Sequence, residues 1–146
     1  AKLITGGDRL ERATPGWYLS PALFIEARNG MQICREEVFG PIASVISVAD
    51  YDEALAVAND ADYGLSAGIV SKDRSKIDHF LDNIQAGMAQ VNLPTAGMDF
   101  HAPFTGRKGS SFGPPEKSSH CREFFTNSKV VHACYGEPHK TGKADS

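Results

Sequence analysis

Between residues 42 and 91, short apolar runs alternate with stretches of helical periodicity, and this alternation constrains the fold more than any other feature. The segments fall at residues 42–48, 51–61, 65–70, 73–84 and 88–91. The first run is nearly continuous and β-branched, which is typical of a strand covered on both faces. The order strand, helix, strand, helix, strand predicts an α/β fold with a parallel sheet and right-handed crossovers.

Both predicted helices carry recognisable ends. Asp50 followed by Glu53 resembles a capping box, and Asp73 is placed to cap the second helix. Gly64 and Gly87 are expected to end the two helices. The apolar side chains expected to face the core are Leu55, Ala58 and Ala54 in the first helix, and Ile77, Phe80, Leu81 and Ile84 in the second.

The segment before residue 42 is predicted to contain short strands. Residues 2–5 form an apolar run ended by two glycines, and residues 17–26 contain Pro21, which favours an edge strand or two short pieces. Asn29–Gly30 is a turn signal. Apolar and polar residues then alternate over residues 31–35, which favours a further strand.

The segment after residue 92 has a different texture. Residues 93–119 are rich in Gly, Pro and Ser, and predict an ordered loop. A short helix is expected near 120–126, followed by a strand at 129–135 that pairs outside this part of the fold. The last ten residues, 137–146, are typical of a frayed tail.

Composition places the chain among globular domains. It has 146 residues, of which 41% are hydrophobic, enough for the core of one domain. The net charge of −3 gives no indication of a nucleic-acid partner. Residues 107–146 are net basic, which indicates either an acidic ligand or subunit neighbour, or solvated lysines. The longest apolar run is too short to cross a membrane, and no secretory signal is visible.

The cysteines indicate a reducing compartment. Cys34, Cys121 and Cys134 are odd in number and have no paired spacing, so no disulfide framework is expected and we predict a cytoplasmic location. His132 and Cys134 would share one face of a strand. Two ligands fall short of the three or four that a zinc site requires, so no metal site is predicted.

The motif search leaves one acidic pair of interest. The sequence has no Gly-x-Ser-x-Gly elbow, no phosphate loop ending in Gly-Lys-Ser/Thr and no Gly-x-Gly-x-x-Gly after a strand. Glu36–Glu37 follow a predicted strand, where a carboxylate can accept hydrogen bonds from a sugar diol. A solvated turn explains the same pair.

Four motifs in register resemble the NAD(P)-dependent aldehyde dehydrogenases. They are E-E-V-F-G-P (36–41), A-N-D-A-D-Y-G-L-S-A (58–67), A-G-M-A-Q-V-N (86–92) and P-F-T-G-R-K (103–108). The resemblance runs from about residue 1 to residue 135. Residues 106–113 and 123–126 look most like the branch that oxidises 2,5-dioxopentanoate, which is α-ketoglutaric semialdehyde.

The resemblance implies roles for five residues. Glu37 corresponds to the family's glutamate that binds the nicotinamide ribose, and Phe39 and Leu65 correspond to positions beside the nicotinamide. Asn92, with the segment after it, and Phe104 correspond to the wall of the aldehyde tunnel. The implied cofactor is NAD or NADP, and the implied substrate is a small aldehyde. The complete enzyme is expected to be a homo-oligomer, a dimer or a tetramer.

The resemblance also implies what the chain lacks. The family's nucleophilic Cys, general-base Glu and cofactor-binding domain are expected upstream of Ala1, so no catalytic residue is assigned and the isolated chain is predicted to be inactive. Residues 1–119 would form the C-terminal half of the catalytic domain. Residues 120–136 would add a helix and an oligomerisation strand, and residues 137–146 a flexible tail.

Two departures from the family leave an alternative open. Thr105 replaces the usual Gly after Pro-Phe, and residues 114–120 lack the usual Arg-Glu-x-Gly. The chain could therefore be a non-catalytic remnant that acts as an oligomerising or binding module. The constellation of Glu37, Phe39 and Leu65 argues against this alternative, because a module without a cofactor has no need of a ribose-binding carboxylate.

Overall fold

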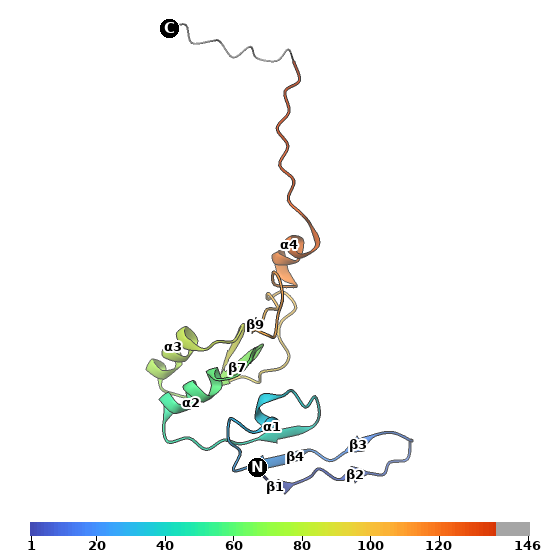
Figure 1. Cartoon of the computed structure of the whole chain (residues 1–146), viewed down its shortest axis with the longest axis vertical. Helices are drawn as coiled ribbons and strands as arrows, with labels where there is room; N and C mark the ends of the chain where they lie inside the picture. Colours follow the sequence, from blue (N-terminus) through green and yellow to red (C-terminus); the bar gives the residue numbers. More distant parts are fainter. Residues whose placement is uncertain (137–146) are drawn as a thin grey trace.

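The first of two sheet regions lies at the N-terminal end of the chain (Figure 1). The computed structural model describes residues 1–136. The sheet consists of β1 (Lys2–Thr5), β4 (Ala22–Ile25) and β5 (Ile42–Ser44) in the order β1-β4-β5. β1 runs antiparallel to β4, whereas β5 runs parallel to it. A hairpin of β2 (Arg9–Leu10) and β3 (Tyr18–Leu19) projects from it, so residues 17–26 form two short pieces.

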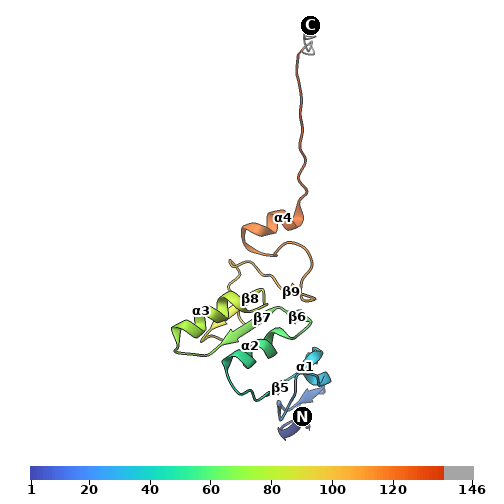
Figure 2. The same cartoon turned by 60° about the vertical axis from the view of Figure 1, so that its left-hand side comes forward.

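The second sheet region contains one parallel β-α-β unit. β7 (Ser66–Ile69) pairs in parallel with β8 (Met88–Val91), and α3 (Arg74–Asn83) connects them. Beside this pair, β6 (Tyr63–Gly64) runs antiparallel to β9 (Arg107–Lys108). Figure 2 shows α2 (Tyr51–Asn59) between the two sheet regions.

The structure mixes helices and strands, as predicted, but the prediction of one continuous parallel sheet is wrong for the described residues. There β5 pairs with β4 and β7 pairs with β8, so α2 connects two sheets. β5 is also shorter than the predicted run at 42–48, and Val45 and Val48 beyond it are exposed. A β-branched run indicates a strand but does not show which neighbours cover it.

The helix starts follow the sequence closely. Asp50 accepts a hydrogen bond from the backbone N–H of Glu53 at 2.9 Å, and the Glu53 carboxylate accepts one from the N–H of Ala49 at 2.6 Å. Asp73 caps α3 by accepting from the N–H groups of Ser75 and Lys76. These bonds satisfy amides that have no partner within the helix.

The predicted helix-ending glycines serve a different purpose. α2 ends at Asn59 and α3 at Asn83, both before the glycines are reached. A Cβ on Gly64 would lie 2.3 Å from the carbonyl oxygen of Gln85, and one on Gly87 would lie 2.2 Å from that of Thr105. Both glycines therefore permit close contact between backbones.

Residues 31–35 form a helical turn, and the predicted strand is wrong. α1 (Gln32–Arg35) is closed by hydrogen bonds from the N–H groups of Cys34 and Arg35 to the carbonyl of Met31, at 2.9 and 3.2 Å. An alternation this short does not distinguish a strand from one turn of helix.

The core lies between α3 and the second sheet. Phe80, Ile84 and Ala86 are buried, and the partly buried side chains packed on them are Tyr51, Leu55, Ala67 and Ile69. Burial raises the pKa of the Tyr51 hydroxyl, with a smaller contribution from the Asp52 carboxylate. Two expected inward positions are wrong, because Leu81 is 45% exposed and Ala58 faces the surface.

The chain beyond β8 is mostly irregular, as expected. Phe104 forms an antiparallel bridge with Glu116, and a 3-10 turn at Ser118–His120 leads into α4 (Cys121–Phe125), which confirms the predicted helix. Residues 129–135 run away from the body and form no strand within the described residues (Figure 1), so their pairing elsewhere stays a prediction. The predicted tail at 137–146 lies outside the described residues.

Within residues 1–136, no helix has both the length and the apolar composition needed to cross a membrane.

Phe80→Ala tests the core. We expect this substitution to lower the free energy of unfolding by about 3 kcal/mol, because it leaves a cavity at the centre of the cluster. Leu81→Ala on the same helix is the control and should cost less than about 1 kcal/mol, because Leu81 is exposed. Urea unfolding followed by circular dichroism measures both. Equal losses would contradict this assignment of the core.

Candidate functional site

An open groove of about 610 Å³ lies between α1 and the β6–β7 segment. One wall carries Cys34, Arg35 and Glu37 from α1 and the loop after it, and the other carries Leu65 and Ser110. Two residues with predicted cofactor roles, Glu37 and Leu65, thus line the same groove although they are far apart in the sequence.

The first wall presents two adjacent carboxylates with different surroundings. Glu36 is the C-cap of α1, and its side chain accepts a hydrogen bond from Gln32 Nε2 at 2.9 Å. Glu37 is exposed at the groove. Both carboxylates line the groove, but only Glu36 accepts a hydrogen bond from a side chain of α1.

Phe39 follows on the same loop but does not line the groove. Its side chain is 91% exposed and its backbone has a φ of +53°. Left-handed backbone is uncommon for bulky residues and costs of order 1–3 kcal/mol, and such strain clusters at ligand-binding sites. The loop therefore holds a large aromatic side chain outward, almost fully exposed within residues 1–136.

The second wall is held by backbone pairing. The N–H of Met88 donates to the carbonyl of Leu65 at 3.0 Å, which holds Leu65 between β6 and β7. The N–H of Gly64 donates to Ser110 Oγ at 2.9 Å, which brings the loop after β9 to the groove. Gly64, which also lines the groove, lies close to the backbone of Gln85.

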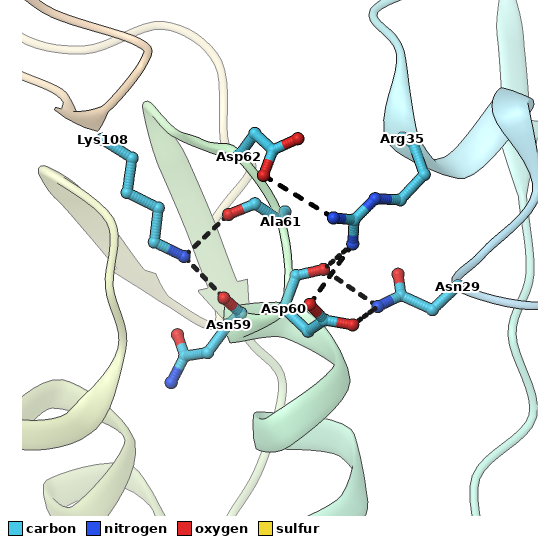
Figure 3. Close-up of polar contacts among 7 residues, drawn as sticks. All are labelled: Asn29, Arg35, Asn59, Asp60, Ala61, Asp62 and Lys108. Carbon is cyan, nitrogen blue, oxygen red and sulfur yellow. Dashed lines mark hydrogen bonds and ion pairs between the residues drawn. The ribbon is translucent and has the colours of Figure 1, made fainter.

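A turn at residues 59–62 joins the two walls. In Figure 3, Arg35 and Lys108 approach this turn from opposite sides. The Arg35 guanidinium donates to the carbonyl of Asp60 and forms ion pairs with the carboxylates of Asp60 at 3.4 Å and Asp62 at 3.6 Å. Asn29 Nδ2 also donates to Asp60, to its carbonyl at 2.9 Å and its carboxylate at 2.7 Å.

The far side of the same turn is held from β9 and α3. Lys108 Nζ donates to the carbonyls of Asn59 and Ala61, at 2.5 and 2.9 Å. The Asn59 side chain accepts from the N–H of Gln85 at 2.8 Å and donates to the carbonyl of Asn83 at 3.0 Å. The segments that carry Glu37 and Ser110 are therefore both bound to the turn at residues 59–62, and the segment that carries Leu65 continues from this turn.

The predicted tunnel residues lie away from the groove. The Asn92 side chain accepts from the N–H of Ser71 and donates to its carbonyl, each at 2.9 Å, so its amide ties the end of β8 to the end of β7. Phe104 is half-buried, and Lys117 Nζ lies 4.9 Å from the centre of its ring. Neither residue lines the groove.

Cysteine and metal chemistry add little. Cys34 is half-buried in the groove wall, whereas Cys121 and Cys134 are exposed, and all three are free. Within residues 1–136, no three potential ligands gather into a metal site.

The sequence reasoning overlooked Arg35 and Ser110 as groove residues. Arg35 was signalled only by its position directly before Glu36–Glu37. Ser110 had no local signal, because its partner Gly64 is 46 residues away.

The comparisons with known proteins now give the family. The sequence model of the aldehyde dehydrogenase family matches residues 1–131. The chain belongs to the aldehyde dehydrogenase family. This confirms the resemblance of the four motifs, and it places the groove in a member of that family.

Curated relatives of this aldehyde dehydrogenase chain include enzymes of the semialdehyde branch. The chain is 42% identical over 138 residues to alpha-ketoglutarate semialdehyde dehydrogenase of Haloferax volcanii, which covers 92% of the chain and 29% of that protein. It is 39% identical over 133 residues to alpha-ketoglutaric semialdehyde dehydrogenase of Bacillus subtilis, covering 90% of the chain and 27% of that enzyme. The chain thus spans less than a third of the length of these relatives.

Solved structures share the fold. The aldehyde dehydrogenase KauB of Pseudomonas aeruginosa superposes with a TM-score of 0.82 at 39% identity, over 89% of this chain and 26% of that one. A mutant of the indole-3-acetaldehyde dehydrogenase AldA of P. syringae, in complex with NAD⁺, gives 0.80 at 36% identity, over 86% and 25%. This aldehyde dehydrogenase chain therefore has the fold of part of the family's enzymes.

Gly64→Ala tests the close contact between the backbones of Gly64 and Gln85. The added Cβ would meet the carbonyl of Gln85, so one backbone must shift, at a cost of about 1–3 kcal/mol in unfolding free energy. Gly30→Ala is the matched control, because nothing lies within 4 Å of its Cβ position. Urea unfolding measures both variants. A neutral Gly64→Ala would mean that the backbones are not in contact there.

Proposed function

We propose that this chain forms the nicotinamide-ribose side of the cofactor site, and part of the aldehyde tunnel, of an oxidoreductase that converts an aldehyde to a carboxylate with NAD(P)⁺. The observation that carries the proposal is that Glu37 and Leu65 line one groove. Family membership gives the reaction class. The names of the relatives support α-ketoglutaric semialdehyde as the substrate.

The chemistry of the groove fits the cofactor. An exposed carboxylate at Glu37 can accept two hydrogen bonds from a ribose diol, and Leu65 offers an apolar surface to a flat ring. Phe39 is a large exposed aromatic on the same loop, which suits packing beside the nicotinamide. NAD(P)⁺ supplies the hydride acceptor, and these side chains orient it.

The tunnel assignment divides into two roles. We assign Phe104 to the wall itself. Asn92 acts through the backbone, because its amide is bound to Ser71 and its φ of +55° turns the chain into the segment that follows β8. That segment and Phe104 would supply the apolar surface that a small aldehyde requires.

The remaining chemistry is assigned to other parts of a complete dehydrogenase. A nucleophilic thiol and a general base are required for aldehyde oxidation through a thioester. We assign neither to a residue of this chain, which spans under a third of the length of its relatives. The three free cysteines agree with a cytoplasmic location. The division at residues 119 and 136 stays a prediction.

A chimera tests the cofactor role of Glu37. This chain replaces the matching segment of the Bacillus subtilis relative, and Glu37→Gln is introduced into the active chimera. Losing the charged acceptor should raise the KM for NAD(P)⁺ about tenfold or more, because a charge-assisted hydrogen bond contributes roughly 1.5–3 kcal/mol. Steady-state kinetics at saturating aldehyde measures the effect.

The control for this experiment is Glu11→Gln, the same chemical change at an exposed position outside the groove. It should leave the KM for NAD(P)⁺ unchanged. The 146-residue chain alone should show no NAD(P)⁺-dependent aldehyde oxidation. Saturable turnover by the chain alone, or a wild-type KM in Glu37→Gln, would overturn the proposal.

One observation favours the alternative of an oligomerising or binding module. Residues 129–135 leave their backbone and apolar side chains open to solvent, with Val130 81% and Tyr135 98% exposed. Extended backbone with unpaired amides is a template for strand pairing between chains. The same segment would serve oligomerisation of a complete dehydrogenase, so the two functions share this surface.

Self-association through this segment is testable. We expect the chain to form dimers or larger species in light scattering, and Val130→Asp to shift the distribution toward monomer by placing a charge in the paired segment. Val70→Asp is the control, because Val70 is equally exposed, at 89%, but lies elsewhere. A monomeric wild-type chain at high concentration would contradict an oligomerisation role.

A further inference from the structure

The cationic side chains at the C-terminal end of α2 come from other segments of the chain. The last carbonyls of a helix lack intrahelical partners and carry partial negative charge, which favours a nearby cation. α2 has acidic residues in its first turn and no basic residue in its last. Arg35 and Lys108 supply cations to the carbonyls of Asp60 and Asn59. The helix end is thus a junction for two distant segments.

Arg35 is the better embedded partner of this junction. Its side chain is 30% exposed, whereas those of Asp60 and Asp62 are 72% and 80% exposed. The guanidinium spans three acceptors on one turn, the Asp60 carbonyl and the two carboxylates. A planar fork of several donors suits such an arrangement, whereas a lysine ammonium presents one point charge.

Arg35 also lies where the two groove walls meet. It comes two residues before Glu37 in the chain, and its partner Asp62 comes three residues before Leu65. Within residues 1–136, the hydrogen bonds that connect the α1 segment to the end of α2 all reach Asp60, from Asn29 and from Arg35. Figure 3 shows both side chains reaching the turn from the α1 side.

We propose that Arg35 is a positioning residue for cofactor binding. It holds the wall that carries Glu37 at a set distance from the wall that carries Leu65, through Asp60 and Asp62. The inference rests on the proposed function of the groove and assigns a residue that acts through another. Exposed ion pairs contribute little to global stability. The effect of Arg35 is therefore expected in the groove rather than in the unfolding free energy.

Hydrogen exchange on the 146-residue chain tests the connection directly. Arg35→Gln should speed exchange of the Glu36 amide, which is bonded to Gln32, and of the Gly64 amide, which is bonded to Ser110, by about threefold or more. Arg74→Gln is the matched control, because it breaks an exposed Arg–Asp pair with Asp78 on α3. Both amides should keep wild-type rates in that variant.

Kinetics in the chimera tests the consequence. Arg35→Gln should raise the KM for NAD(P)⁺ about two- to tenfold, while kcat and the KM for the aldehyde change less than twofold. Arg35→Lys should give an intermediate KM, because one cation remains but cannot span three acceptors. Adding Asp62→Asn to Arg35→Gln should raise the KM no further, because both changes remove the same contact.

The outcomes separate this inference from the function on which it rests. Unchanged exchange at Glu36 and Gly64 in Arg35→Gln would overturn the positioning role, whether or not the chimera is active. A wild-type KM in Arg35→Gln, beside a raised KM in Glu37→Gln, would overturn it and leave the proposed function intact. A wild-type KM in both variants would overturn both.

Discussion

The arrangement of the chain depends on which groups donate hydrogen bonds to the backbone carbonyls at the C-terminal end of α2. Helix termini leave carbonyl groups without partners in the helix, and here these groups lie at the turn of residues 59–62. Lys108, Arg35 and Asn29 donate to these carbonyls, and the Asn59 side chain binds the backbone at the end of α3. Segments from three parts of the chain therefore converge on one turn, and the groove lies beside it.

The chain carries more apolar surface than its small core can bury. Within residues 1–136, the buried core cluster consists of Phe80, Ile84 and Ala86, whereas Phe39 and Phe112 are 91% and 100% exposed. Apolar surface in contact with water is unfavourable, so these side chains are available to pack against other groups. This agrees with a chain that spans under a third of the length of its relatives.

Local signals predicted the starts of the two longer helices well. Asp50 and Asp73 cap their helices because a carboxylate and an amide two or three residues apart meet in any helix start. Gly64 and Gly87 were misread because their close contacts involve Gln85 and Thr105, which are far away in sequence. The predicted strand at residues 31–35 failed because one turn of helix and a short strand share the same alternation.

Sequence patterns were enough to predict a fold of both helices and strands, the two capped helices and, through the motifs, the family. These follow from periodicity and from residue order, which the chain carries before it folds. The folded structure was needed to show that Glu37 and Leu65 share a groove with Ser110, that Asn92 is bound to Ser71, and that Arg35 joins the two walls. Each of these depends on backbone segments that approach each other only after folding, so no local pattern encodes them.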